Sequence, residues 1–280
     1  MSKRDRNSEI WRGKWAVVTG ASSGIGKAIA EELAAHGAHL LLTARRLDRL
    51  NELAESLESK HGIQSKAFQA DLNDAQAPER LFAFTKEQSL MIDLLVNNAG
   101  LGRYGEFYSS DLASRLSMVQ VHCHAVVHLT HLFLGGMVER RSGYILIVAS
   151  TSLIPAPYIA TYAATKGFDL LFAEGIAEEV ARYGVRVSAL CPGPTASEMV
   201  MTKDGTSVEQ HSSLHAADAV AREGLRGLAK GKRYIRPSLP DWLTANAPRF
   251  LPRATVSGAM ERIFYRPKHL GSVAPAAARD

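Results

Sequence analysis

Short apolar segments alternate with longer amphipathic segments along most of the chain. In the apolar segments nearly every residue is hydrophobic over a few positions, which is typical of strands buried on both faces of a parallel sheet. Six such strands are expected, at residues 15–19, 38–43, 67–69, 93–96, 144–148 and 185–190.

The segments between these strands carry apolar residues three and four positions apart, the spacing of one face of a helix. This pattern covers residues 28–35, 47–57, 81–88, 112–138 and 162–183, and it returns at 216–228 and 255–264, with a last short strand at 233–235. Strand and helix alternation builds a parallel sheet by βαβ units. We therefore expect an α/β fold: one Rossmann-like, doubly wound parallel sheet of about seven strands with helices on both faces.

The length and composition fit one domain. The chain has 280 residues, of which 46% are hydrophobic and 22% charged, as in ordinary globular proteins. We expect a single dinucleotide-binding catalytic domain over residues 13–270, between a basic tail at 1–12 and a tail at 271–280. Within it, polar residues at about 195–217 indicate a substrate lid, and four prolines introduce a C-terminal helical extension at about 239–266.

Charge and cysteine content limit the expected partners and cellular location of the protein. The net charge of +5 favours phosphate-bearing ligands only mildly, and no dense basic stripe indicates a nucleic-acid partner. Two cysteines and no leader pattern favour a cytoplasmic protein without a disulfide framework. No apolar run approaches the roughly 20 residues that span a bilayer, so membrane contact is not expected beyond a peripheral one.

A glycine-rich turn follows the first strand directly and opens the first helix. It reads Thr19-Gly-Ala-Ser-Ser-Gly-Ile-Gly26. Glycines in such a turn let backbone N–H groups approach a pyrophosphate at the positive end of the helix. The spacing T-G-x-x-x-G-x-G resembles the classical short-chain dehydrogenase/reductase family, and the resemblance extends over about residues 13–197.

The resemblance implies a set of cofactor contacts. The dinucleotide would lie against Gly20, Ser22, Ser23, Gly24, Ile25 and Gly26. Residues after the third and fourth strands would contact the adenine and its ribose: Asp71, Leu72, Asn98, Ala99 and Gly100. Asp71 has the alternative of capping a helix that begins near Asn73.

The residues after the second strand predict the cofactor NADP(H). NAD-preferring folds place an acid there to bind the ribose 2′-hydroxyl, but this chain has Ala44-Arg45-Arg46. A guanidinium pairs with a 2′-phosphate by charge-assisted hydrogen bonds. We therefore assign Arg45 to the phosphate, with Ser22 as a helper, and interpret Arg46 as solvated.

Ser150 follows the fifth strand, and Tyr162 and Lys166 share one face of the next helix because they are four residues apart. A nearby ammonium favours the phenolate and makes the tyrosine usable as an acid or base near neutral pH. The resemblance implies that Ser150 steadies the substrate oxygen, that Tyr162 exchanges its proton and that Lys166 also holds the nicotinamide ribose.

The chain departs from the family pattern in two places. The interval from Ser150 to Tyr162 is twelve residues, one fewer than the commonest interval, so Thr151 or Ser152 is an alternative hydroxyl. His122 stands where an asparagine usually completes a proton relay from the lysine. A neutral imidazole can relay a proton through a water, and a merely structural helix histidine is an equal alternative.

Two further groups complete the candidate site. The resemblance places a nicotinamide-side loop after the sixth strand, with Pro192, Gly193, Thr195 and Ser197 at the cofactor. His124, His128 and His131 lie at helical spacing, but no cysteine or carboxylate completes a metal set, so we interpret them as interface or solvent histidines.

The sequence thus predicts an NADPH-preferring oxidoreductase that transfers hydride between the nicotinamide and a carbonyl or secondary alcohol. The alternatives are a nucleotide-binding scaffold that has lost turnover and a peripheral membrane reductase that acts on a lipid-like ketone. A homodimer or homotetramer follows from the resemblance. Apolar residues around the expected pocket indicate a small or partly apolar substrate: Tyr104, Phe107, Met199, Val200 and Met201.

Overall fold

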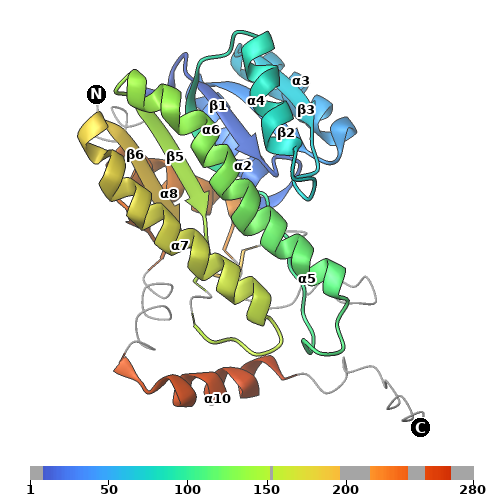
Figure 1. Cartoon of the computed structure of the whole chain (residues 1–280). Coiled ribbons are helices and arrows are strands. Elements are labelled where there is room, and N and C mark those ends of the chain that lie inside the picture. Colours follow the sequence, from blue (N-terminus) through green and yellow to red (C-terminus); the bar gives the residue numbers. More distant parts are fainter. Residues whose placement is uncertain (1–8, 152–153, 196–214, 239–249, 266–280) are drawn as a thin grey trace.

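The computed structural model describes residues 9–151, 154–195, 215–238 and 250–265. A single parallel sheet of seven strands lies at its centre, in the order β3-β2-β1-β4-β5-β6-β7 (Figure 1). This architecture confirms the expected doubly wound fold. The strands are β1 (Trp15–Thr19), β2 (His39–Ala44), β3 (Ser65–Gln69), β4 (Ile92–Asn97), β5 (Gly143–Val148), β6 (Val185–Leu190) and β7 (Tyr234–Ile235).

Successive residues of the central strands point to opposite faces, and each face packs against its own layer of helices. Ala16 and Val18 of β1 belong to a core shared with α2 (Gly24–Ala35), α3 (Leu47–His61) and α8 (Ala217–Ala229). Val17 belongs to the opposite core, shared with α4 (Ala77–Glu87), α6 (Ala125–Glu139) and α7 (Ala160–Val180). All three side chains are essentially buried, which explains why β1 reads as a continuous apolar run.

The strand order reverses between β1 and β4. In such sheets the loops after these two strands turn to opposite faces, and the crevice between them is where ligands bind. The glycine-rich turn follows β1, and the segment from Asn98 follows β4. The topology therefore brings the two predicted cofactor segments to the same edge of the sheet.

The helix expected at 112–138 is a longer helical run with an irregular centre. It consists of α5 (Leu112–Val119), a π-helical turn η2 (Gln120–His124) and α6, which are continuous in Figure 1. A π-helical turn accommodates one extra residue and is frequent at functional sites. By length and composition the run Leu112–Glu139 is apolar enough to cross a membrane, contrary to our expectation, although 44% of its most apolar window is buried within the protein.

Smaller differences concern the ends of elements. Helix α4 begins at Ala77 instead of residue 81, with a proline in its first turn, where a missing N–H costs nothing. Helix α10 (Arg253–Phe264) lies beyond the carboxyl end of β5 (Figure 1). Most of the expected lid, including Ser197 and residues 199–201, lies outside the described residues, as does Ser152.

Candidate active site

The glycine turn has the backbone that a bound dinucleotide requires. Gly20 and Gly24 have positive φ angles of 65° and 54°, which residues with a side chain rarely adopt. A Cβ atom on Gly26 would collide with the carbonyl of Gly20 and with the side chain of Asn98. The turn is therefore a tight cradle at the amino end of α2, where backbone N–H groups and the helix dipole favour a pyrophosphate.

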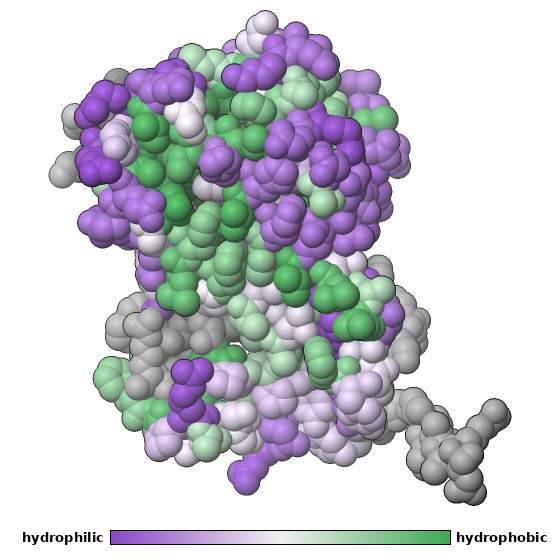
Figure 2. All heavy atoms as spheres, in the orientation of Figure 1, coloured by the Kyte–Doolittle hydropathy of each residue, from purple (hydrophilic) through white to green (hydrophobic). Residues whose placement is uncertain are grey.

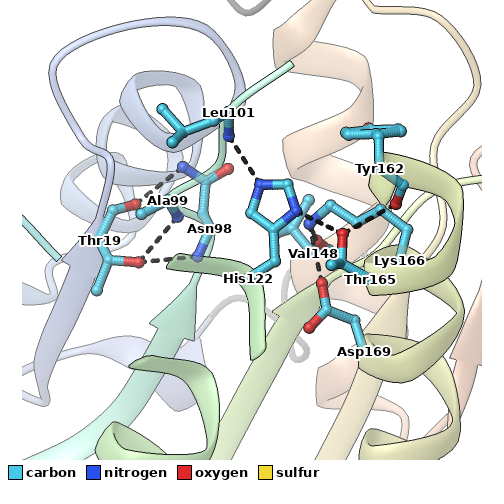
Figure 3. A network of polar contacts seen from close by, with 10 residues as sticks. All are labelled: Thr19, Asn98, Ala99, Leu101, His122, Val148, Tyr162, Thr165, Lys166 and Asp169. Carbon is cyan, nitrogen blue, oxygen red and sulfur yellow. Dashed lines mark hydrogen bonds and ion pairs between the residues drawn. The ribbon is translucent and has the colours of Figure 1, made fainter. Parts of the chain in front are cut away.

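Thr19 and Asn98 fasten this cradle to the loop that follows β4. The Thr19 hydroxyl accepts the backbone N–H groups of Asn98 and Ala99 at 2.9 and 3.0 Å, and it donates to the carbonyl of Val96 at 3.1 Å. The Asn98 amide donates in return to the carbonyl of Thr19 at 2.8 Å (Figure 3). The two segments predicted to contact the cofactor thus form one hydrogen-bonded unit.

The two arginines after β2 have different surroundings. Arg46 donates from Nη2 to the hydroxyls of Ser22 and Ser23, at 3.0 and 3.3 Å. Our interpretation of Arg46 as solvated is therefore wrong, because its guanidinium lies on the glycine turn. Arg45 is exposed, and its backbone carbonyl accepts from the side chain of Gln69.

The remaining predicted cofactor residues lie at the same edge of the sheet. Asp71 is exposed and its Oδ1 accepts the N–H of Asn73 at 3.0 Å, so it closes a turn ahead of α4, whereas Leu72 is buried. After β6, the Thr195 hydroxyl donates to the carbonyl of Gly193. The loop after β3 and the loop after β6 are thus each stabilised by a hydrogen bond between their own residues.

Tyr162 and Lys166 come from the first turns of α7. Lys166 is 3% exposed, and its Nζ donates to the carbonyl of Val148 at 2.7 Å and to Oδ2 of Asp169 at 2.9 Å (Figure 3). Burial disfavours the ammonium, but the charges of Asp169 and Tyr162 outweigh it and raise the pKa of Lys166 above its usual value. The structure therefore holds a charged lysine next to the tyrosine.

Ser150 and Thr151 are both 7% exposed at the end of β5. The backbone N–H of Thr151 donates to the carbonyl of Pro192 at 3.0 Å, which links this segment to the loop after β6. Ser150 and Pro192, both assigned from the sequence, therefore come from neighbouring segments at the carboxyl edge of the sheet.

His122 is completely buried within η2, and both of its ring nitrogens are engaged. Nε2 accepts the backbone N–H of Leu101 at 2.8 Å, and Nδ1 lies 2.8 Å from the hydroxyl of Thr165. Burial first, and then the Lys166 ammonium, hold the pKa of His122 well below its usual range. The neutral ring therefore carries its proton on Nδ1 and donates to Thr165, whose hydroxyl donates to the carbonyl of Tyr162.

The other histidines of this helix contact neighbours on the surface. His128 lies 3.0 Å from a carboxylate oxygen of Glu79, and His124 pairs with Gln120. In the part of the chain that the structure describes, no three histidine, cysteine or acidic residues gather as a metal site would require.

The site geometry agrees with the comparisons with known proteins. Residues 14–207 match the family model described as short chain dehydrogenase, which covers the glycine turn, Ser150, Tyr162 and Lys166. The chain belongs to the short-chain dehydrogenase family. It is therefore an oxidoreductase of the class that acts on CH–OH and C=O groups.

Relatives within this family extend over nearly the whole chain. The very-long-chain 3-oxoacyl-CoA reductase of Bos taurus is 31% identical over 269 residues, which cover 92% of this chain and 84% of that protein. A short-chain dehydrogenase from Sphingobium yanoikuyae, solved in complex with NADPH, has a TM-score of 0.76 and 26% identity, covering 95% of this chain and 100% of that one. A bulky-bulky ketone specific alcohol dehydrogenase from Comamonas testosteroni has a TM-score of 0.73 and 25% identity, covering 91% and 96%.

Four residues at this short-chain dehydrogenase site were not assigned from the sequence. They are Thr19, Arg46, Thr165 and Asp169, which contact the assigned residues through the hydrogen bonds given above. Asp169 had the clearest signal, since an acid three residues after a lysine lies on the same helix face.

Proposed function

We propose that this protein is an NADPH-preferring reductase of ketones on partly apolar, chain-like substrates. The observation that carries the proposal is the buried, charged Lys166 next to Tyr162 on α7, at the edge of the sheet where the glycine turn lies. The very-long-chain 3-oxoacyl-CoA reductases and the bulky-ketone enzyme among the relatives support the substrate class.

The residues at the β1 edge fit a dinucleotide, because the glycines at 20 and 26 let the turn pack against Asn98 and Ala99 in a tight form that a Cβ atom would prevent. The turn from Gly20 to Gly26 would hold the pyrophosphate, and Asn98 keeps that turn in shape. Arg46 and Arg45 would face a 2′-phosphate, and Ser22 of the turn accepts a hydrogen bond from Arg46. When bound, the nicotinamide supplies the hydride for the carbonyl carbon.

The chain's own residues supply the proton to the substrate carbonyl oxygen and stabilise the charge that develops on it. In reduction, Tyr162 donates its phenolic proton to the carbonyl oxygen as negative charge develops there. Ser150 donates a hydrogen bond to the same oxygen. Lys166 stabilises the phenolate that remains, which lowers the energy of proton transfer at neutral pH. The Thr165 hydroxyl donates to the backbone carbonyl of Tyr162 and so helps to fix the position of Tyr162.

The test is a substrate panel followed by NADPH absorbance. It contains 3-oxoacyl thioesters of rising chain length, bulky apolar ketones and short polar ketones, each with NADPH and with NADH. We expect kcat/KM to rise with apolar chain length and to be higher with NADPH. Binding of NADPH without turnover on any ketone would instead favour a nucleotide-binding scaffold.

A second candidate function is supported by the surface of α10. Ile263 of α10 is 66% exposed, and Phe250 and Leu251, which lie just before the helix, are 88% and 52% exposed; Arg253 and Arg262 of α10 are exposed near them in the sequence. Exposed apolar side chains with basic neighbours, on a helix and in the residues that lead into it, are typical of contact with an anionic membrane surface. We propose that α10 places the carboxyl edge of the sheet at a membrane that supplies a lipid-like ketone.

The oligomeric state is proposed from the face of α5, α6 and α7. Figure 2 shows apolar side chains gathered along this face. Exposed members include Leu112, Leu116, Val127, Phe168 and Leu171. Exposed apolar patches of this kind mark interaction sites, and we propose that a second copy of the chain covers this one in a homodimer or homotetramer.

A further inference from the structure

Asp169 is a second buried charge at the active site, and it takes no part in the proton and hydride transfer proposed above. It lies one turn after Lys166 on α7, its side chain is 1% exposed, and its Oδ2 is 2.9 Å from Nζ. Its other oxygen, Oδ1, is buried and has no hydrogen-bond partner within the described residues. Figure 3 shows the carboxylate below the lysine, on the side away from the Tyr162 ring.

A buried carboxylate with one unsatisfied oxygen lowers the stability of the fold unless its ion pair compensates for the lost hydration. A buried ion loses its hydration, and an ion pair recovers this loss only with good geometry. Because only one oxygen of Asp169 accepts a hydrogen bond, a gain in folding stability does not by itself explain this residue. The lysine gains from it, because a fully buried ammonium without a counter-ion would tend to lose its proton.

Apart from Tyr162, which is the reacting group, the other ionisable groups around Lys166 do not supply that counter-charge. Burial raises the pKa of the thiol of Cys191 to about 12 and that of Cys123 to about 11, so both are neutral near pH 7. His122 is held neutral by burial. The groups that act on Lys166 are Tyr162 and Asp169 on its own helix, His122 and Cys123 of η2, and Cys191 after β6.

We propose that Asp169 is a positioning residue that keeps the Lys166 ammonium charged and fixes its direction before the cofactor binds. Two of the three N–H donors of the ammonium are directed at Val148 and Asp169. The third is thereby oriented for the ribose of the nicotinamide. The inference rests on the proposed function and deepens it, because it assigns to Asp169 the task of orienting Lys166.

The first test is the pH profile of the oxidation reaction, measured on the alcohol that the substrate panel identifies. In the wild type, kcat/KM should stay level on the alkaline side to about pH 10, because Lys166 keeps its proton there. In Asp169→Asn, burial should remove the lysine proton within that range, and kcat/KM should fall about tenfold for each further pH unit. Asp169→Glu, which keeps the charge, should restore the level region. A flat alkaline limb in Asp169→Asn would overturn the proposal.

The second test needs neither cofactor nor turnover. Melting temperatures are compared for the wild type, Lys166→Met, Asp169→Leu and the double variant. Each single variant leaves one buried charge unpaired and should melt about 10 °C lower, whereas the double variant should recover most of that loss. Additive losses in the double variant would show that the two residues are uncoupled and would contradict the proposal. A wild type without turnover on any substrate would count against the proposed function, and this cycle would still show whether the charges of Lys166 and Asp169 are coupled.

Discussion

The Nε2 atom of His122 accepts the backbone N–H of Leu101 at 2.8 Å, so a side chain of η2 holds the loop that follows β4. The opposite nitrogen binds Thr165 on α7. With both nitrogens engaged, the ring connects the cofactor edge to the catalytic helix. This geometry favours the structural alternative for His122 over a proton relay through a water.

The first prediction concerns the acid stability that follows from His122. An unfolded histidine takes up a proton below about pH 6.5, whereas the folded ring does not, so the free energy of unfolding should fall as the pH drops below that value. The contribution is about 1.4 kcal/mol for each pH unit. His122→Asn should lose this part of the slope in urea unfolding between pH 7.5 and 5, and His61→Asn on α3 serves as the control. An unchanged slope in His122→Asn would mean that the folded ring already binds a proton.

The second prediction separates the two arginines after β2. If Arg46 faces the 2′-phosphate, Arg46→Ala should weaken NADPH binding about 10- to 100-fold, as expected for a charge-assisted contact, and should change NADH binding little. Arg45→Ala is the matched variant one residue away. Fluorescence titration of both nucleotides measures each effect. A loss confined to Arg45→Ala would restore the assignment made from the sequence.

The third prediction resolves which hydroxyl after β5 assists the substrate oxygen. Loss of one oxyanion donor typically lowers kcat about 10²- to 10³-fold. We expect this loss in Ser150→Ala and a much smaller one in Thr151→Ala, although both residues are equally buried. Steady-state kinetics on one ketone compare the two, and the reverse order would move the role to Thr151.

The fourth prediction concerns the exposed apolar face of α5, α6 and α7. Leu171→Glu should dissociate the oligomer in light scattering after size exclusion, because a charge on an apolar interface is left desolvated, whereas Leu47→Glu on α3 should not. A monomeric wild type would exclude the proposed interface.

The membrane surface on α10 is tested separately by flotation with anionic liposomes. The double change Phe250→Ser with Leu251→Ser should abolish flotation, since it removes two exposed apolar side chains at the start of this surface. Met91→Ser, a similarly exposed residue at the opposite edge of the sheet just before β4, is the control. Equal flotation of all three proteins would contradict a role for α10.

Much of the fold follows from the sequence because the strands are buried on both faces. The apolar runs at β1 and β6 have the predicted bounds, Trp15–Thr19 and Val185–Leu190. The π-helical turn η2 does not follow, because an inserted residue leaves the apolar pattern of the run almost unchanged.

The site was less completely predicted for a different reason. Motif spacing locates Tyr162 and Lys166, but partners that meet across elements carry no local signal. Arg46 reaches Ser22 from 24 positions away, and His122 reaches Thr165 from 43. The choice between neighbouring arginines depends on backbone direction at the end of β2, which the sequence pattern does not encode.

The most direct test of the account is the rate of NADPH-dependent ketone reduction by the wild type and by Tyr162→Phe. The variant keeps the ring and loses only the phenolic hydroxyl. We predict normal NADPH binding with kcat lowered about 10²- to 10⁴-fold, the usual contribution of a positioned acid. A Tyr162→Phe enzyme that reduces the ketone at the wild-type rate would contradict the assignment of Tyr162 as the proton donor and with it the proposed mechanism.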